Sequence, residues 1–380
     1  MTSALTDEQR DLVAVINDFC RRELGDREQW DKLTDSGKHL HNTELYGKMA
    51  ELGWLGIATP QAYGGVDGGM VDLVLFLETT AYWQAPIGGF ATSAITAASY
   101  QKFGTEQQKT QVLGDFLAGR VLAVSMSEPG AGSDVAALAC KAEQRDGGWV
   151  INGQKTWCSN AHIAEHILLV ARTSTDGGKH DDLTMFSVPA TASGLTIRGI
   201  ETMNGREVND LYFTDCHVAA DAVVGEVGQG WRQLMAGLNL ERIILAAHML
   251  GTARRAFDDT VAYVRERHQF GRPIGSFQAL RHRIADHATE LACTQLLVHD
   301  VARRIDANPD KSLPREASMA KLKATEFAKA MALDGMQMMG GYGYATEYGM
   351  ERLLRGTLAS TVYGGTSEIQ RDIIGKTYGL

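Results

Sequence analysis

The most restrictive feature of this sequence is the order in which two hydrophobic periodicities follow each other. Apolar residues recur at helical spacing over residues 1–120, as short strand-like runs over 121–225, and again at helical spacing over 226–380. Strands grouped in the middle of a chain exclude a doubly wound sheet, in which strands and helices alternate. The order predicts a mainly α-helical protein with an N-terminal helical domain, a middle β domain and a C-terminal helical bundle, divided at these residues.

Helical and strand patterns can be placed on particular segments. Three long segments carry a helical period in the C-terminal part: Trp231–Tyr263, Phe277–Ile305 and Arg315–Met339. Helices of this length commonly pack side by side as a bundle. Near the N-terminus, Thr6 followed three residues later by Gln9 predicts a capping box at the first helix.

The middle part is expected to form a compact β domain of several short strands. The runs Val121–Met126, His166–Val170, Leu183–Val188 and Leu211–Val218 have strand-like patterns. The segment Trp149–Gly153 reads as a strand that a turn at Gly153 ends.

Charge and cysteine content restrict the classes of function. The net charge of −9 and the lack of a basic run argue against nucleic-acid binding. Five dispersed cysteines without a CxxC pair are typical of reduced thiols. Because the start of the chain lacks the features of a signal or transit peptide and no apolar stretch reaches membrane-spanning length, we expect a cytoplasmic protein without a membrane partner.

Glycine-containing polar segments recur at several places and are candidates for ligand contacts. Ser127–Asp134, Gln337–Tyr344 and Val362–Gln370 combine glycines, which allow close backbone approach, with polar side chains. Gly153–Ala161 adds a Trp two residues before a Ser, which suits stacking on a flat cofactor. Each segment also has a structural interpretation: a tight turn, a glycine helix cap or a core Trp. The histidines form no H-E-x-x-H pattern, so no metal is expected.

Taken together, these motifs give the chain a resemblance to the acyl-CoA dehydrogenase family over nearly its whole length. The resemblance implies a β-barrel-like middle domain and a C-terminal four-helix bundle. It also implies bound FAD, an acyl-CoA substrate, an electron-transfer flavoprotein as partner, and a homotetramer with FAD at a subunit interface. Some relatives build a heterotetramer with one working site per pair of chains.

The resemblance also assigns roles to individual residues. It implies that FAD is contacted by Met126, Ser127, Gly132, Ser133, Trp157, Ser159, Arg267, Gln269, Phe270, Gln278, Gln337, Gly340, Gly341, Thr366 and Glu368. It implies that the acyl-CoA is contacted by Ser133, Asn239, Arg242 and Gly365.

The catalytic base stands at an unusual place in this sequence. Many family members carry a Glu immediately before the Gly-Thr of the final loop, where this chain has Gly364. Gly364 keeps a backbone N–H that can polarise the thioester oxygen. Glu241 is the candidate base, because it lies at helical spacing with Leu238 and Leu245, where burial would raise its pKa. Isovaleryl- and long-chain-type dehydrogenases resemble the sequence in this respect. The alternative is a structural Glu241 paired with Arg242 or with a group at an interface.

The expected reaction is the FAD-dependent α,β-dehydrogenation of an acyl-CoA to a trans-2-enoyl-CoA. Glu241 would take the α-proton and hydride would leave for flavin N5. Two alternatives stay open. One is an enoyl-CoA reductase of the crotonobetainyl-CoA type, whose members also combine a Glu-Arg helix with a Gly-Gly loop. The other is a non-catalytic subunit of a heterotetramer, which the Gly356 found where the family usually has Asp also allows.

Overall fold

The computed structural model describes residues 5–175, 177–178 and 180–380. The chain divides into two compact units, each made of separated segments. The first unit contains residues 1–30, 69–85 and 239–380, and the second contains residues 31–68 and 86–238. The N-terminal third of the chain therefore contributes helices to both units.

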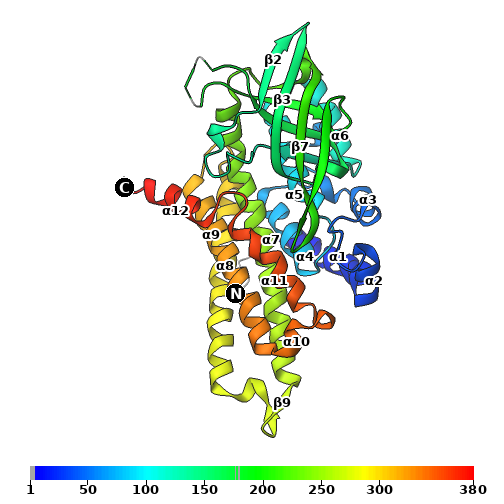
Figure 1. The fold of residues 1–380 in the computed structure, drawn as a ribbon. Helices are drawn as coiled ribbons and strands as arrows, with labels where there is room; N and C mark the ends of the chain where they lie inside the picture. Colours follow the sequence, from blue (N-terminus) through cyan, green and yellow to red (C-terminus); the bar gives the residue numbers. More distant parts are fainter. Residues whose placement is uncertain (1–4, 176, 179) are drawn as a thin grey trace. The chain divides into compact units, whose positions relative to one another are not determined.

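The second unit is built on an eight-stranded sheet (Figure 1). Its strand order is β6-β7-β3-β2-β4-β5-β8, and β1 pairs in parallel with β4. The core between these strands contains Ile151, Ile167, Phe186 and Leu211, all fully buried. The strands are β1 (Val121–Ser125), β2 (Lys141–Arg145), β3 (Gly148–Ser159), β4 (Ala164–Arg172), β5 (Leu183–Pro189), β6 (Leu195–Thr202), β7 (Gly205–Ala219) and β8 (Val223–Val224).

Helices α3 (Thr43–Glu51), α5 (Gly89–Phe103) and α6 (Glu106–Leu117) complete the second unit, and α2 (Arg27–Thr34) lies at the division between the units. Helix α5 packs against β1. The buried hydroxyl of Ser93 accepts a hydrogen bond from the amide of Leu122 at 2.8 Å. This contact fixes α5 against the strand that leads into the Ser127–Asp134 segment.

The regular elements among the described residues of the first unit are helices and a short hairpin of β9 (His268–Gln269) and β10 (Arg272–Pro273). Its helices pack very closely: a Cβ at Gly251 of α7 would lie only 2.1 Å from the carbonyl oxygen of Glu78 on α4. Helix α9 packs against α8, α11 and α12. The helices are α1 (Asp7–Leu24), α4 (Met70–Tyr82), α7 (Gly230–Glu266, its first part in the other unit), α8 (Gln278–Ala307), α9 (Pro314–Met339), α10 (Gly341–Tyr344), α11 (Met350–Leu358) and α12 (Ser367–Lys376).

The expected mainly helical architecture with strands grouped in the middle of the chain is confirmed. Thr6 caps α1 through the predicted capping box with Gln9. The turn expected at Gly153 is wrong, because β3 continues to Ser159. Gly153 lies at φ +143° beside a shift in the β3–β7 register, so the strand passes through a bulge instead of ending.

Helix α7 is the one helix in the described ranges long and apolar enough to cross a membrane by length and composition alone. Half of its most apolar window is buried inside the protein, which is what a core helix shows.

Candidate active site

The loop before α12 has the geometry of a ligand-binding loop. Gly364 and Gly365 lie at φ +61° and +80°, where side chains are strongly disfavoured. Lys321 Nζ donates to the carbonyl oxygen of Gly365 at 2.7 Å. Gln370 Nε2 donates to the carbonyl oxygens of both glycines, at 3.0 and 3.1 Å. Both carbonyl groups are therefore held from the protein side.

The amide group of Gly364 is left free by this arrangement. It donates to no acceptor among the residues that the structure describes. A backbone N–H whose neighbouring carbonyls are fixed is a preorganised donor for an oxygen atom of a ligand. Gly364 thus has the property expected of the donor to the thioester oxygen.

The carboxylate of Glu241 on α7 faces this loop. A Cβ at position 364 would lie 3.5 Å from Glu241 Oε1 and 2.3 Å from Leu245 Cδ1. Glu241 is half-buried, and its carboxylate forms no hydrogen bond or ion pair with any residue in the described ranges. The neighbouring Arg242 instead donates to Asn239 Oδ1 at 2.8 Å. The expected alternative, a Glu241–Arg242 pair, is absent from the described contacts.

Two opposing influences act on the protonation of Glu241. Burial raises the pKa of its carboxyl, and the charges of Arg242 and Lys321 oppose this rise. Lys321 is fully buried, and burial lowers the pKa of its ammonium group to about 8 against the opposing effect of Glu241. A carboxylate with a raised pKa and no partner is chemically suited to accept a proton.

Asn239 and Arg242 lie one turn of α7 or less from Glu241. Asn239 Nδ2 donates to Ser312 Oγ at 2.9 Å. Arg242 is buried, and its Nε has no acceptor among the described residues. An unmet donor on a buried cation is available to a polar group of a ligand.

The segment after β1 forms a second cluster, in the other unit. Ser127 accepts a hydrogen bond through its carbonyl from the amide of Thr156 at 2.9 Å. Gly132 and Ser133 are exposed, and a Cβ at Gly132 would meet nothing within 4 Å. The segment thus presents open backbone and a hydroxyl group on a rigid support.

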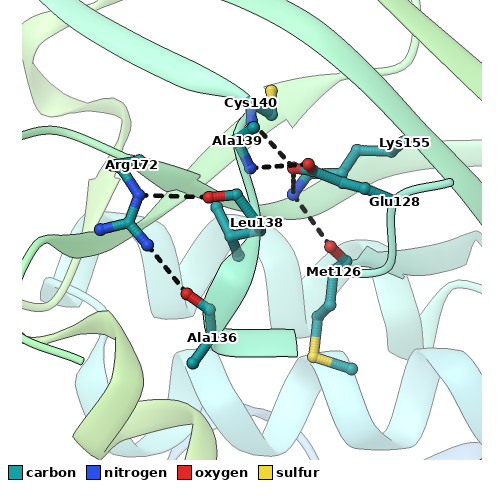
Figure 2. A network of polar contacts seen from close by, with 8 residues as sticks. All are labelled: Met126, Glu128, Ala136, Leu138, Ala139, Cys140, Lys155 and Arg172. Carbon is teal, nitrogen blue, oxygen red and sulfur yellow. Dashed lines mark hydrogen bonds and ion pairs between the residues drawn. The ribbon is translucent and has the colours of Figure 1, made fainter. Parts of the chain in front are cut away.

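A buried ion pair makes this support rigid (Figure 2). Lys155 of β3 donates to Glu128 Oε1 at 2.8 Å and to the carbonyl oxygen of Met126 at 2.9 Å. Glu128 also accepts from the amides of Ala139 and Cys140, at 2.6 and 2.9 Å. One carboxylate therefore ties the segment to the backbone that leads into β2.

Arg172 of β4 fixes the backbone between this segment and β2 (Figure 2). Its Nε donates to the carbonyl oxygen of Leu138 at 3.1 Å and a terminal nitrogen donates to that of Ala136 at 2.8 Å. Backbone held by several charge-assisted bonds keeps one conformation, which a binding loop needs.

Trp157 stands out among the residues of β3. It is 60% exposed and lies at φ +59°, where the β3–β7 register shifts between Lys155 and Cys158. A bulky residue in the left-handed region is strained, and such strain is concentrated at functional sites. Ser159 follows two residues later on the same strand and is half-buried. This geometry suits stacking against a flat ligand.

The remaining predicted cofactor residues lie in the helical unit. Phe270 is 91% exposed at φ +52° in the turn of the β9–β10 hairpin, between Arg267 and Gln278 in the chain. Gly340, just after α9, lies at φ +62°, and a Cβ at Gly340 or Gly341 would meet nothing within 4 Å. Open glycine backbone of this kind can approach a cofactor closely.

The remaining residues of this set lie at the ends of helices or of the short strand β9. Thr366 caps α12, accepting from the amide of Ile369 at 3.2 Å, and Glu368 is exposed in the first turn. Gln269 closes the β9 strand, and Gln337 lies in the last turn of α9.

Sequence reasoning missed several residues that build these clusters. Lys321 and Gln370 hold the glycine loop, and Glu128 and Lys155 hold the Ser127 segment. The signal for Lys321 was a charged residue at helical spacing with Ala317 and Ala324, on the buried face of α9. Within the described ranges, no group of three His, Cys, Asp or Glu side chains could hold a metal ion.

Sequence models of three domains of one family match nearly the whole chain. They are described as acyl-CoA dehydrogenase N-terminal domain, residues 6–120, middle domain, residues 123–216, and C-terminal domain, residues 228–379.

Curated relatives and solved structures agree with this match. The chain is 36% identical to a mitochondrial isovaleryl-CoA dehydrogenase of Arabidopsis thaliana, over 88% of this chain and 83% of that protein. It is 32% identical to a 3-(aryl)acrylate reductase of Clostridium sporogenes, over 97% of each. An acyl-CoA dehydrogenase structure from Geobacillus kaustophilus superposes with a TM-score of 0.93 at 30% identity over 100% of both chains. The FAD complex of PigA superposes with a TM-score of 0.92 at 26% identity, also over 100% of both.

The observed residues fit a bound flavin. The open glycine backbone at Gly132, Gly340 and Gly341, the exposed and strained Trp157, and the capped start of α12 are the kinds of groups that hold a flat ring and a phosphate-bearing chain. With three matching domain models and relatives above 30% identity over most of its length, the chain belongs to the acyl-CoA dehydrogenase family and is an FAD-binding oxidoreductase.

Proposed function

We propose that this enzyme converts an acyl-CoA thioester to its trans-2-enoyl-CoA with Glu241 as the base that removes the α-proton. The single observation that supports this most is the position of the Glu241 carboxylate, 3.5 Å from where a side chain at Gly364 would begin. Related enzymes that carry their base at the position of Gly364 would direct it into the same space. The carboxylate is unpaired within the described ranges, and its pKa is raised by burial.

The backbone of the glycine loop takes the complementary role. The α-proton of a thioester is weakly acidic, so the carbonyl oxygen needs donors where negative charge develops. The amide of Gly364 is unpaired within the described ranges. Gln370 fixes the carbonyl groups of Gly364 and Gly365, and Lys321 also fixes that of Gly365. Bound FAD supplies the acceptor for the hydride that leaves the β-carbon.

We assign the remaining predicted residues to binding. Asn239, Arg242, Gly365 and Ser133 would contact the acyl-CoA. Of these, Arg242 has a buried donor without an acceptor among the described residues.

The exposed Phe270 supports a homotetramer in which the β9–β10 hairpin is covered by another copy. Electrons would pass to an electron-transfer flavoprotein, and the proposed location is the cytoplasm, although the Arabidopsis relative is named as mitochondrial. The cofactor contacts would be Met126, Ser127, Gly132, Ser133, Trp157, Ser159, Arg267, Gln269, Phe270, Gln278, Gln337, Gly340, Gly341, Thr366 and Glu368.

An anaerobic absorbance titration tests the assignment of the base. The purified enzyme is mixed with butyryl-, isovaleryl- and octanoyl-CoA, and bleaching of the flavin absorbance is followed. We expect Glu241→Gln to abolish bleaching while the flavin content per chain stays at the wild-type value. Glu347→Gln, which removes an exposed carboxylate from the same unit, is the matched control. Bleaching by Glu241→Gln at the wild-type rate would contradict the assignment.

Reduction of an enoyl thioester is the second candidate function. The observation in its favour is the 32% identity to a 3-(aryl)acrylate reductase over 97% of both chains. In that direction Glu241 would return a proton to the α-carbon. Oxidation of a reduced flavin by cinnamoyl-CoA, with no bleaching by any saturated thioester, would favour it. A chain that bleaches with none of these compounds would point to a partner subunit of a heterotetramer.

A further inference from the structure

Lys321 occupies a position that the proposed reaction does not yet explain. Its side chain is fully buried in α9, and its ammonium group is 2.7 Å from the carbonyl oxygen of Gly365. Burying an ammonium group is costly unless it is paired or hydrogen-bonded. No carboxylate forms an ion pair with Lys321 among the described residues. Its ammonium group instead donates to the Gly365 carbonyl and interacts with other charges at longer range.

Lys321 therefore connects both chemical parts of the site. Through the Gly365 carbonyl it holds the Gly365–Thr366 peptide of the loop that also carries the Gly364 amide. Through space its charge acts on Glu241, and each of these two groups alters the protonation of the other. The charged groups that face Lys321 are Glu241 and Arg242 on α7, Glu326 on α9 and Glu368 on α12.

We propose that Lys321 is a positioning residue of this active site, which fixes the Gly364 amide through the Gly365 carbonyl and stabilises the ionised, proton-accepting form of Glu241. This inference rests on the proposed role of Glu241. A positive charge near a carboxylate favours ionisation and lowers the pH at which the carboxylate becomes a base. Burial raises the pKa of Glu241, and the charges of Arg242 and Lys321 both oppose this rise.

Gln370 offers a matched control within the same loop. It is fully buried and donates to the carbonyl oxygens of Gly364 and Gly365, yet it carries no charge. Gln370→Met therefore loosens the loop without changing the field at Glu241. Lys321→Met removes a hydrogen bond and the charge together, whereas Lys321→Arg keeps a permanent charge.

The experiment measures α-proton exchange, which needs the base but no hydride transfer. Holoenzyme with dithionite-reduced flavin is incubated in deuterium oxide with butyryl- or isovaleryl-CoA, and loss of the α-proton signal is followed by NMR between pH 5 and 10. We expect Lys321→Met to move the acidic limb of the profile upward by about one pH unit or more, which lowers exchange below the limb by about tenfold. Lys321→Arg should keep the limb in place. Gln370→Met should lower exchange at every pH without moving the limb.

A second variant covers the case in which Lys321→Met fails to fold. Lys321→Gln keeps a polar side chain without the charge, and it should move the acidic limb upward as Lys321→Met does. An acidic limb that stays unmoved in both Lys321→Met and Lys321→Gln would overturn the role of Lys321. A wild type whose exchange is unaffected by Glu241→Gln would instead overturn the proposed base, and this inference with it.

Discussion

Glu241 on α7 and Gly364 in the loop before α12 face each other, so that a Cβ at position 364 would lie 3.5 Å from Glu241 Oε1. Two segments more than 120 residues apart in the chain thus meet at one point, where α7 supplies a carboxylate and the final loop supplies none. A base carried on either segment can reach the same region. Leu245, one turn beyond Glu241, fills the space that a side chain at position 364 would need.

This geometry predicts that the base cannot simply be moved to the final loop. Glu241→Gly combined with Gly364→Glu should stay inactive, because the new Cβ would lie 2.3 Å from Leu245 Cδ1 and the backbone is left-handed. Adding Leu245→Ala to the pair should restore measurable flavin bleaching by acyl-CoA. Equal activity with and without the Leu245 change would contradict the steric argument.

Stability measurements test the same position independently of activity. Gly364→Ala should lower the free energy of unfolding by about 1–2 kcal/mol from backbone strain alone, and further through the contact with Leu245. Gly356→Ala is the control, since Gly356 lies inside α11 with nothing within 4 Å of an added Cβ. There the exchange of Gly for Ala should stabilise the helix by about 0.5–1 kcal/mol. Urea unfolding of the two variants gives both values.

The buried pair under the Ser127 segment predicts a strongly coupled double-mutant cycle. Glu128→Gln or Lys155→Met alone leaves one buried charge without its partner and should cost about 3–5 kcal/mol of stability. The double variant should cost clearly less than the sum of the two single changes. Thermal unfolding of the four proteins measures the coupling. Additive losses would show that the two groups act separately.

Much of the fold follows from local signals in the sequence. The remaining parts depend on contacts between residues that are far apart in the chain. Thr6 and Gln9 define the start of α1 because a capping box is contained within four residues. The turn predicted at Gly153 was wrong, because a glycine that permits a bulge cannot be distinguished from one that ends a strand until the register with β7 is known. Lys321 was missed since its partner, the Gly365 carbonyl, lies 44 residues away. Glu241 could be singled out from the sequence because a carboxylate among apolar residues is a signal within one helix, and its role as the base stays a prediction.

A carboxyl group in the β unit predicts a pH dependence of stability. Burial raises the pKa of Glu207 to about 7, so the folded protein binds a proton that the unfolded chain releases near its ordinary pKa of 4.5. Stability from this group is complete below pH 4.5 and is lost as pH rises through 7. Glu207→Gln should therefore unfold at a higher temperature than the wild type at pH 8, which corresponds to a gain in stability of at most about 3 kcal/mol. At pH 4 the two proteins should unfold at the same temperature. Glu201→Gln, at an exposed position on β6, should show no such difference between the two pH values.

The strained conformation of Trp157 predicts that a change there raises stability and weakens cofactor binding. Its side chain is 60% exposed at φ +59°, a conformation that Asn tolerates far better than Trp. Trp157→Asn should therefore raise the unfolding temperature of the flavin-free protein while weakening FAD binding several-fold, because stacking area is lost. Val227→Asn removes another exposed apolar side chain from the same unit and should leave FAD affinity unchanged. Fluorescence titration of the apoprotein with FAD measures the affinity. A variant that gains stability without losing affinity would show that the strain at Trp157 serves no cofactor contact.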